Sequence, residues 1–335
     1  MTITPTRSVE RVRTHVDPAI RAMLDRLDRR NRLVAGYQLG FWDADGTPTT
    51  ATGKGLRPAL ALLSARATGA EADLGIPGAV AVELAHNFSL LHDDVMDRDV
   101  ERRHRPTAWT VFGTGPAILA GDALMGLAGE ALIGATNGAV AAHRLNTDVR
   151  CLIAGQAADL DFEQRDDVGV EECLEMAADK TSALLSCACA LGALLCEAPD
   201  ALVAGLSRFG THLGLAFQLV DDLLGIWGDP DRTGKPVGSD LRARKKTAPI
   251  VWAAASDTIP GRAFAALYRT QRELTEEELA RAARLIERTG AREWTERQAE
   301  RESTAALAEL PELSLPDDVH RELAELAAFT NGRDH

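Results

Sequence analysis

The chain has 335 residues and a formal net charge of −13, and 45% of its residues are hydrophobic but only 4% aromatic. This acidic balance argues against a general nucleic-acid binder, which needs a basic face. A protein with this charge that holds anionic ligands needs local cations or metal ions.

Apolar residues recur at helical spacing along most of the chain, and no run alternates as a strand would. In chain order, we expect helices over residues 8–35, 57–69, 77–98, 116–138, 139–165, 171–197, 200–227, 248–256, 260–271, 275–288, 290–308 and 316–329. Residues 36–56 and 228–247, rich in Gly, Thr and charged residues, predict loops. No linker or repeat divides the chain. We therefore expect an all-α fold with a single domain over residues 1–335, in which 1–30 form a flexible or dimer-contacting extension.

The N-terminus lacks an apolar core of signal-peptide length, and charges or glycines interrupt the apolar stretches short of about 18 residues. The five cysteines include no CxxC pair, which favours free thiols over disulfides or a zinc site. These features predict a cytoplasmic protein without a transmembrane segment.

Two acidic clusters follow apolar helices: Asp93, Asp94 and Asp97 in DDVMD, and Asp221 and Asp222 in FQLVDDLLG. Asp93 and Asp97 share one helix face, so their carboxylates repel each other unless a cation lies between them. Mg²⁺ suits this role because it takes one or two carboxylates together with waters and phosphates. A lone DDxxD is more often a solvated helix end. Two clusters, able to face each other across a bundle core, instead predict metals that hold one diphosphate.

Basic residues provide candidate anion sites in this acidic chain. They are Lys54 and Arg57 in GKGLRP, Arg102 and Arg103 after the first acidic cluster, Lys180 beside Thr181, Lys235, and Lys245 beside Lys246. Each alone is an ordinary surface charge. Together they predict one metal-mediated and one metal-free diphosphate site, as a reaction between two diphosphate esters requires.

These residues lie in ordered motifs: GKGLRP (53–58), ELAHNFSLLHDDVMD (83–97), RRHRPT (102–107), GDAL (121–124), GQAADL (155–160), DKTSALL (179–185), FQLVDDLLG (217–225) and GDPDRTGKPVGSDLRARKK (228–246). With them the chain resembles the trans-isoprenyl diphosphate synthases, or polyprenyl synthetases, from about residue 50 to 255. The resemblance implies antiparallel helices around a deep central cavity and a homodimer. It also implies Mg²⁺-dependent head-to-tail condensation of isopentenyl diphosphate with an allylic diphosphate.

The resemblance also implies roles for single residues. Three Mg²⁺ ions would be bound by Asp93 and Asp97, supported by Asp94, and by Asp221 with Asp222 beside it. The allylic diphosphate would be held by Arg102, Lys180 and Lys235, with Lys245 also binding substrate. Isopentenyl diphosphate would be held without metal by Lys54, Arg57, His86 and Arg103. Lys180, Thr181, Gln218 and Arg102 would form the catalytic set, with Thr181 and Gln218 near the carbocation.

One position departs from the family pattern. Gly225 stands where the last aspartate of a second DDxxD motif is expected, so a carboxylate is missing one turn after Asp221. We expect the activity to survive with weaker Mg²⁺ affinity.

The product length depends on the helix that precedes Asp93. Ser89, four residues earlier, leaves room below the acids, while Phe88 is rotated away by about 140° and can floor the pocket. With no insertion in DDVMD, this pattern looks like the geranylgeranyl (C20) synthases of the family. A farnesyl (C15) product is the near alternative, and Phe88 can also be an ordinary core residue.

Two other functions stay open at this point. A class I terpene cyclase shares the fold and an acidic metal site, but has no reason to keep a metal-free site such as Lys54, Arg57, His86 and Arg103. A non-catalytic partner subunit tends to lose its acids, and Gly225 keeps this reading open.

Overall fold

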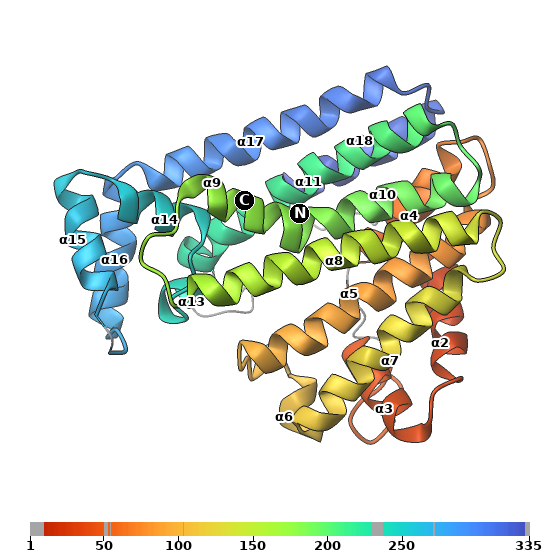
Figure 1. The fold of residues 1–335 in the computed structure, drawn as a ribbon, viewed down its shortest axis with the longest axis horizontal. Helices are drawn as coiled ribbons and strands as arrows, with labels where there is room; N and C mark the ends of the chain where they lie inside the picture. Colours follow the sequence, from red (N-terminus) through yellow and green to blue (C-terminus); the bar gives the residue numbers. More distant parts are fainter. Residues whose placement is uncertain are drawn as a thin grey trace. The chain divides into compact units, whose positions relative to one another are not determined.

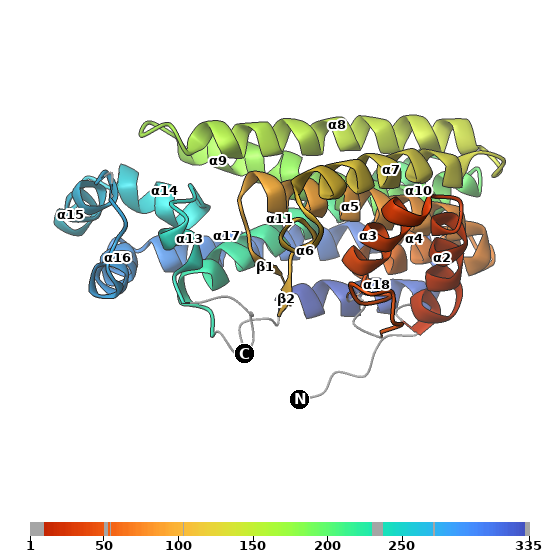
Figure 2. The same ribbon diagram turned by 90° about the horizontal axis from the view of Figure 1, so that it is seen from below.

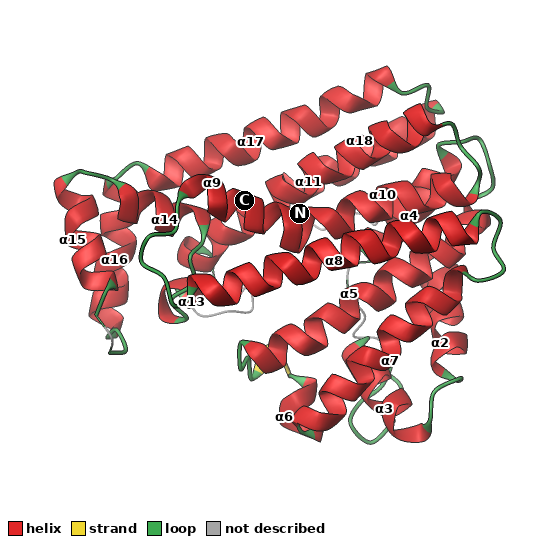
Figure 3. Cartoon of the chain, in the orientation of Figure 1, coloured by secondary structure: helices red, strands yellow, loops and turns green. Residues whose placement is uncertain are grey.

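The structure is a computed structural model that describes residues 10–49, 53, 55–102, 104–229, 237–270 and 272–331. Helices make up most of the described chain, as Figure 3 shows in red. The only described strands are β1 (Glu101–Arg102) and β2 (Arg105–Pro106), a short antiparallel hairpin labelled in Figure 2. The all-α prediction is confirmed.

Contacts divide the chain into two compact units. Unit 1 comprises Met1–Val149, Leu184–Gly210 and Glu309–Leu326, and unit 2 comprises Arg150–Ala183, Thr211–Ala308 and Ala327–His335. The boundaries fall inside helices: α8 (Gly138–Phe162), α10 (Ala183–Leu195), α11 (Asp200–Trp227), α17 (Ala291–Glu309) and α18 (Asp317–Asn331). The expectation of a single domain stays a prediction.

Unit 1 is built from helices on either side of the long helix α5. Its elements are α2 (Asp17–Leu24), α3 (Arg29–Gln38), α4 (Leu56–Arg66), α5 (Ile76–Met96), α6 (Ala108–Phe112), α7 (Thr114–Leu132), the start of α8, most of α10 (Ala183–Leu195), the start of α11 and most of α18 (Asp317–Asn331). Pro77 in the first turn favours the start of α5, and α5 and α7 lie side by side (Figure 1). Val12, Val16, Ile20 and Leu24 are all buried, so residues 10–24 pack into this unit.

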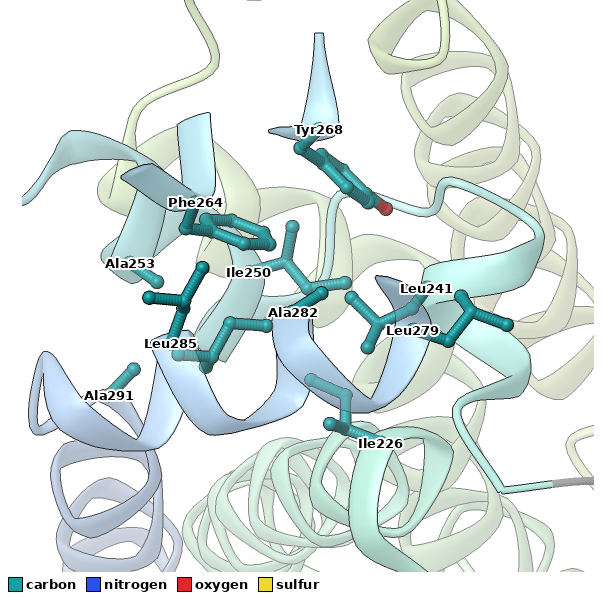
Figure 4. Packing of buried hydrophobic residues seen from close by; sticks show 11 residues of the cluster. Ile226, Leu241, Ile250, Ala253, Phe264, Tyr268, Leu279, Ala282, Leu285 and Ala291 are labelled. Atoms are coloured by element: carbon teal, nitrogen blue, oxygen red, sulfur yellow. The ribbon is translucent and has the colours of Figure 1, made fainter. Parts of the chain in front are cut away.

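Unit 2 carries a separate hydrophobic cluster. Its elements are the end of α8, α9 (Val170–Ala177), the π-helical turn Ala178–Ser182, most of α11, α13 (Ser239–Arg242), α14 (Ala248–Ala255), α15 (Ile259–Tyr268), α16 (Glu276–Arg288) and α17 (Ala291–Glu309). Figure 4 shows the cluster, in which the buried members are Ile226, Leu241, Ile250, Ala253, Phe264, Tyr268, Leu279, Ala282, Leu285, Ile286 and Ala291. Leu241 belongs to this core, and it fixes the short helix α13 against its neighbours.

Most expected helices are present, but several differ from the structure. The helix expected over 8–35 is broken at 25–28 between α2 and α3, the one expected over 116–138 ends at Leu132, and α6 was not expected. The helix expected over 171–197 is interrupted by the π-helical turn, the expected loop 228–247 contains α13, and α3 extends into the expected loop 36–56. Two helical stretches, Ala72–Met96 and Val170–Leu195, are long and apolar enough by composition to cross a membrane. However, 67% and 72% of their apolar windows are buried inside the described structure, as in core helices.

Candidate functional site

The first acidic motif forms the end of α5 in unit 1. Asp93 and Asp94 lie in its last turn and Asp97 caps it, with the Asp97 N–H donating to the Asp93 carbonyl (2.8 Å). Asp94 is only 1% exposed, and burial raises its pKa to about 6 although Arg102 opposes the shift; the charges of Asp99 and Asp97 raise it further. The sequence assigned Asp94 a supporting role, yet it is the most buried acid of the motif.

Arg102 lies on β1 and binds this buried acid. Its Nε donates to Asp94 Oδ1 at 2.7 Å, and its Nη2 lies 2.6 Å from the same oxygen and 3.6 Å from Asp99 Oδ2. The other oxygen, Asp94 Oδ2, is buried and has no hydrogen-bond partner among the residues that the structure describes. The hairpin thus brings a predicted diphosphate ligand and a predicted metal-site acid together.

The proposed metal-free site begins at the start of α4. Gly55 adopts a left-handed conformation (φ 65°) before the helix, and a Cβ atom placed on it would lie 3.0 Å from Val12 Cγ1. Arg57 then faces α5, where its Nη1 lies 3.1 Å from His86 Nε2. Two predicted members of this site are therefore in contact. Lys54 and Arg103, predicted with them, lie outside the described residues, as does Lys235.

The two residues expected to set product length occupy different surroundings on α5. Ser89 is buried, and its Oγ donates to the His86 carbonyl at 2.8 Å. Phe88 is partly buried and packs edge-on against the ring of His92, with 4.8 Å between ring centroids. Phe88 is thus held by the residue next to Asp93, a contact that the sequence reasoning missed.

His92 is in turn held against α7. Its Nε2 lies 3.0 Å from the Ile118 carbonyl oxygen. A Cβ atom on Gly121 would lie 2.4 Å from the same nitrogen, so only glycine leaves room for the ring. Gly121, the first residue of the GDAL motif, therefore sets the position of His92 and, through it, of Phe88.

The second acidic motif lies on α11 in unit 2. Asp221 is exposed, whereas Asp222 is 4% exposed and accepts hydrogen bonds from Gln218 Nε2 (2.8 Å) and the Ala248 N–H (3.0 Å). Burial raises the pKa of Asp222 to about 8; the two hydrogen bonds oppose this shift, and the charges of Asp240 and Asp221 add to it. Asp222 is therefore a strongly perturbed acid.

A chain of hydrogen bonds extends from Asp222 to the π-helical turn. Thr181 Oγ1 donates to Gln218 Oε1 at 2.6 Å, and the Gln218 amide donates onward to Asp222. π-Helical turns recur at functional sites because they redirect side chains from the helix. The turn lies tight against α8, since a Cβ atom on Gly155 would lie 2.4 Å from the Lys180 backbone nitrogen.

Two predicted substrate-binding lysines converge on one buried acid. Lys180 Nζ lies 2.6 Å from Asp159 Oδ2, and Lys245 Nζ lies 3.2 Å from the same oxygen and 3.1 Å from Glu163 Oε1. Burial acts to raise the pKa of Asp159, but the two lysines outweigh it and hold the pKa below its ordinary value. Asp159, in the GQAADL motif, had no role in the sequence reasoning.

A side chain from another helix occupies the space next to Gly225. A Cβ atom placed on it would lie 2.1 Å from Asp240 Oδ2, and the Ser239 hydroxyl donates to the Gly225 carbonyl at 3.3 Å. The N-terminal part of α13 therefore lies directly against the glycine of the second motif.

The acids fit a cation that arrives with its own ligands. No group of three or more His, Cys, Asp or Glu side chains within the described ranges is arranged to hold a metal by itself. Mg²⁺ needs no such cage, because waters and substrate phosphates complete its octahedral shell. The unpaired Asp94 Oδ2 and the raised pKa values of Asp94 and Asp222 are features that a bound cation relieves.

A family model for polyprenyl synthetase matches residues 47–286. The chain belongs to the polyprenyl synthetase family. It is 47% identical over 320 residues to the (2E,6E)-farnesyl diphosphate synthase of Mycobacterium tuberculosis, covering 94% of this chain and 89% of that protein. It is 45% identical over 308 residues to the geranylgeranyl diphosphate synthase of the same organism, covering 91% and 88%.

Solved structures agree with this assignment. A polyprenyl synthetase from Streptomyces coelicolor A3(2) superposes with a TM-score of 0.92 at 49% identity, covering 98% of this chain and 99% of that one. A geranylgeranyl pyrophosphate synthase from Corynebacterium glutamicum, in complex with isoprenyl diphosphate and magnesium, gives a TM-score of 0.84 at 26% identity over 99% and 100%. The protein is thus a prenyltransferase that elongates prenyl chains on the isoprenoid synthase fold, which disfavours the cyclase and the non-catalytic subunit.

Proposed function

We propose that the protein condenses isopentenyl diphosphate head-to-tail with an allylic diphosphate in a Mg²⁺-dependent reaction, and that its main product is geranylgeranyl diphosphate. The observation that carries this proposal is the repeated arrangement of a buried aspartate with a raised pKa at the polar end of an apolar helix. Asp94 is one case and Asp222 the other. The membership of the chain in the polyprenyl synthetase family and the magnesium complex of the Corynebacterium relative support the same function.

Different residues of the chain are proposed to bind the metal ions and the allylic diphosphate. We assign Asp93, Asp97 and Asp221 as direct Mg²⁺ ligands, with Asp94 and Asp222 beside them. Mg²⁺, when bound, neutralises the charge that develops on the departing diphosphate. We assign the allylic diphosphate to Arg102, which is oriented by Asp94, and to Lys180 and Lys245, which are oriented by Asp159.

The remaining residues serve the second substrate and the cation. Arg57 and His86 bind isopentenyl diphosphate, together with Lys54 and Arg103, and Lys235 assists at the allylic diphosphate. The oxygens of Thr181 and Gln218 lie near the allylic cation and stabilise it. Apolar side chains exclude water, and the proton released after bond formation passes to the departing diphosphate.

The proposal of a C20 product rests on Phe88 and on the absence of an insertion in the DDVMD motif. A farnesyl product is the second candidate, because the farnesyl and geranylgeranyl synthases of Mycobacterium are almost equally similar to this chain. We favour C20 because Ser89 leaves space next to Asp93, while the Phe88 ring is turned toward His92.

We further propose a homodimer. Helix α7 exposes Ile118 and Leu119, at 38% and 59%, and α8 exposes Val140 at 49%. A second copy of the chain can cover these apolar side chains. Sedimentation analysis should therefore give twice the chain mass, and Leu119→Glu should shift the protein toward monomer.

A product assay tests the proposed reaction. Purified protein is incubated with Mg²⁺, isopentenyl diphosphate and, separately, dimethylallyl, geranyl or farnesyl diphosphate, and the hydrolysed products are sized by chromatography with mass detection. A C20 alcohol supports the proposal, and a product that stops at C15 supports the second candidate. Hydrocarbon formed without isopentenyl diphosphate overturns the proposed reaction. Asp93→Asn should abolish turnover, whereas Asp200→Asn at the start of α11 should not.

A further inference from the structure

The hairpin of β1 and β2 is too short to hold its position by itself. Each strand has two residues, with Glu101 opposite Pro106 and Arg102 opposite Arg105. A two-stranded hairpin is marginally stable in water, and like charges directly opposite each other weaken it further. The described part of the hairpin buries no large apolar side chain, and Val100 before it is 64% exposed. Contacts with other elements must therefore fix the hairpin.

One set of contacts joins the hairpin to the end of α5. Arg102 binds the buried acid Asp94 through Nε and Nη2. Just after the hairpin, Thr107 Oγ1 and Trp109 Nε1 each donate to the Asp99 carbonyl at 2.7 Å. These contacts hold one side of the hairpin near the first acidic motif.

A second set of contacts joins the hairpin to α3 and the loop after it. The hydroxyl of Tyr37, a residue that is 7% exposed, donates to the Pro106 carbonyl at 2.7 Å. Arg105 Nη1 donates in return to the Tyr37 carbonyl at 3.3 Å, and its guanidinium lies over the Tyr37 ring, 4.3 Å from the centroid. Arg105 Nη2 also donates to the Trp42 carbonyl and to Asp43 Oδ1, both at 3.3 Å. Arg105 and Tyr37 thus bind each other's strand and helix.

The loop that receives Arg105 is itself well fixed. Trp42 Nε1 donates to the Leu33 carbonyl at 2.8 Å, and a Cβ atom on Gly36 would lie 1.9 Å from Cζ2 of the Trp42 ring. The ring therefore lies directly against α3. The Asp43 N–H donates to the Thr47 carbonyl at 2.8 Å and closes the loop. The hairpin is thus held against an ordered part of unit 1.

We propose that Tyr37 and Arg105 are positioning residues for substrate binding, because they fix the hairpin from which Arg102 meets the allylic diphosphate. The inference rests on the proposed function, which assigns Arg102 to that substrate. Tyr37 precedes residues 47–286, the region that the family model matches. A segment outside the family pattern then completes the substrate site.

Amide hydrogen exchange tests this positioning without substrate or metal. Mass spectrometry follows the peptides that cover residues 100–107 in the wild type, Arg105→Met and Tyr37→Phe. Both variants should exchange there at least about tenfold faster, while the peptides of unit 2 stay unchanged. The matched control is Arg32→Met, because the Arg32 guanidinium also stacks on an aromatic ring, 5.0 Å from the centroid of Trp42. This control should exchange like the wild type.

Calorimetric titration with inorganic pyrophosphate and Mg²⁺ tests whether the effect passes through Arg102. Arg105→Met should weaken pyrophosphate binding about tenfold, because Arg102 is no longer preoriented. Tyr37→Phe should have a smaller effect, since the ring under Arg105 remains. In an Arg102→Met background, Arg105→Met should have little further effect, because the residue through which it acts is absent.

Steady-state kinetics distinguish positioning from a loss of folded protein. Arg105→Met should raise KM for geranyl diphosphate about tenfold and change kcat less. A smaller fraction of folded enzyme would instead lower kcat and leave KM unchanged. Thermal unfolding, which should stay close to that of the wild type, gives an independent check.

The outcomes separate this inference from the proposed function. If the wild type forms no product from isopentenyl and geranyl diphosphates, the proposed function fails. If the wild type is active but Arg105→Met keeps its exchange rates and its pyrophosphate affinity, the inference is wrong and the function stands. Equal weakening by Arg105→Met with and without Arg102 also overturns it, as does a lower kcat with an unchanged KM.

Discussion

Arg102 contacts Asp94 with two nitrogens, and both lie against the same carboxylate oxygen. Nε and Nη2 lie 2.7 and 2.6 Å from Oδ1, while Oδ2 is buried without a hydrogen bond within the described part of the chain. An unsatisfied buried carboxylate oxygen costs free energy. The pair thus leaves one buried oxygen of Asp94 without a hydrogen bond at the end of α5, next to the acids that we assign to Mg²⁺.

Removing the guanidinium group of Arg102 should destabilise the protein in a pH-dependent way. Arg102→Met should lower the free energy of unfolding at pH 8 by about 2 kcal/mol, less than for a fully buried pair because Arg102 is partly exposed. At pH 5 the loss should be smaller, since Asp94 is then mostly protonated. Urea unfolding at both pH values measures this. Arg262→Met, which breaks an exposed pair, should change little; equal losses at both pH values would contradict the expectation.

The hydrogen bond between Thr181 and Gln218 should matter for turnover. Thr181→Val keeps the shape but removes the donor at 2.6 Å, which leaves the Gln218 carbonyl unpaired and frees the amide that holds Asp222. We expect kcat to fall at least tenfold and stability by about 1 kcal/mol.

Two variants control for side effects of this change. Thr181→Ser should retain most of the activity, because it keeps the hydroxyl. Thr295→Val removes a buried threonine hydroxyl that bonds the Ala291 carbonyl, and it should affect stability alone. Steady-state kinetics that show full activity for Thr181→Val would rule out a role for this contact.

The raised pKa of Asp222 predicts an unusual pH dependence of stability. Its folded pKa of about 8 lies above the ordinary value of 3.8, so between these values the folded state keeps a proton that the unfolded state has released. Stability should therefore fall as the pH rises through this window, by up to about 1.4 kcal/mol per pH unit. Asp94, with a pKa raised to about 6, adds a contribution of the same sign over the lower part of the window.

Thermal unfolding of the metal-free protein between pH 5 and 9 measures this effect. Asp222→Asn should flatten the profile, because the amide does not titrate. Mg²⁺ with pyrophosphate should raise the unfolding temperature most at high pH, where the carboxylate is ionised. A wild-type profile with no slope above pH 6 would show that Asp222 keeps an ordinary pKa.

The contact between Gly121 and His92 should influence product length. Gly121→Ala places a methyl group where the His92 ring lies, which forces the ring and its partner Phe88 to move. We expect a changed ratio of C15 to C20 products with isopentenyl and dimethylallyl diphosphates, and longer products for Phe88→Ala. Phe112→Ala, which removes another edge-on aromatic contact in the same unit, should leave the ratio unchanged.

Sequence patterns predicted most helices because their apolar residues recur every three to four positions. The helix expected over 77–98 corresponds to α5, which ends at Met96, and the one expected over 200–227 matches α11, since polar residues interrupt the apolar pattern at the end of each. The π-helical turn Ala178–Ser182 was missed because its composition does not differ from a regular helix. Helix α13 was missed because its four residues depend on a tertiary contact, the burial of Leu241.

The site was harder to predict where partners are distant in sequence. Arg102 follows Asp94 within one motif, but Lys245 meets Asp159 across 86 residues, and Asp240 reaches Gly225 from another helix. Nothing in the local pattern reveals such pairs. Glycines were the available signal, because Gly121, Gly155 and Gly225 each mark a place where another group occupies the space of a side chain.

The π-helical turn also constrains the number of residues in its segment. Such a turn contains one residue more than an α-helix needs for the same hydrogen-bonded rise, so the faces before and after it are offset by about 100°. A chain shorter by one residue between Ala177 and Ala183 could still form an unbroken helix. In that helix, however, Cys173 and Leu185, both buried now, could not both stay on their present faces. Natural sequence variation in this segment should therefore consist of substitutions and not of single-residue deletions.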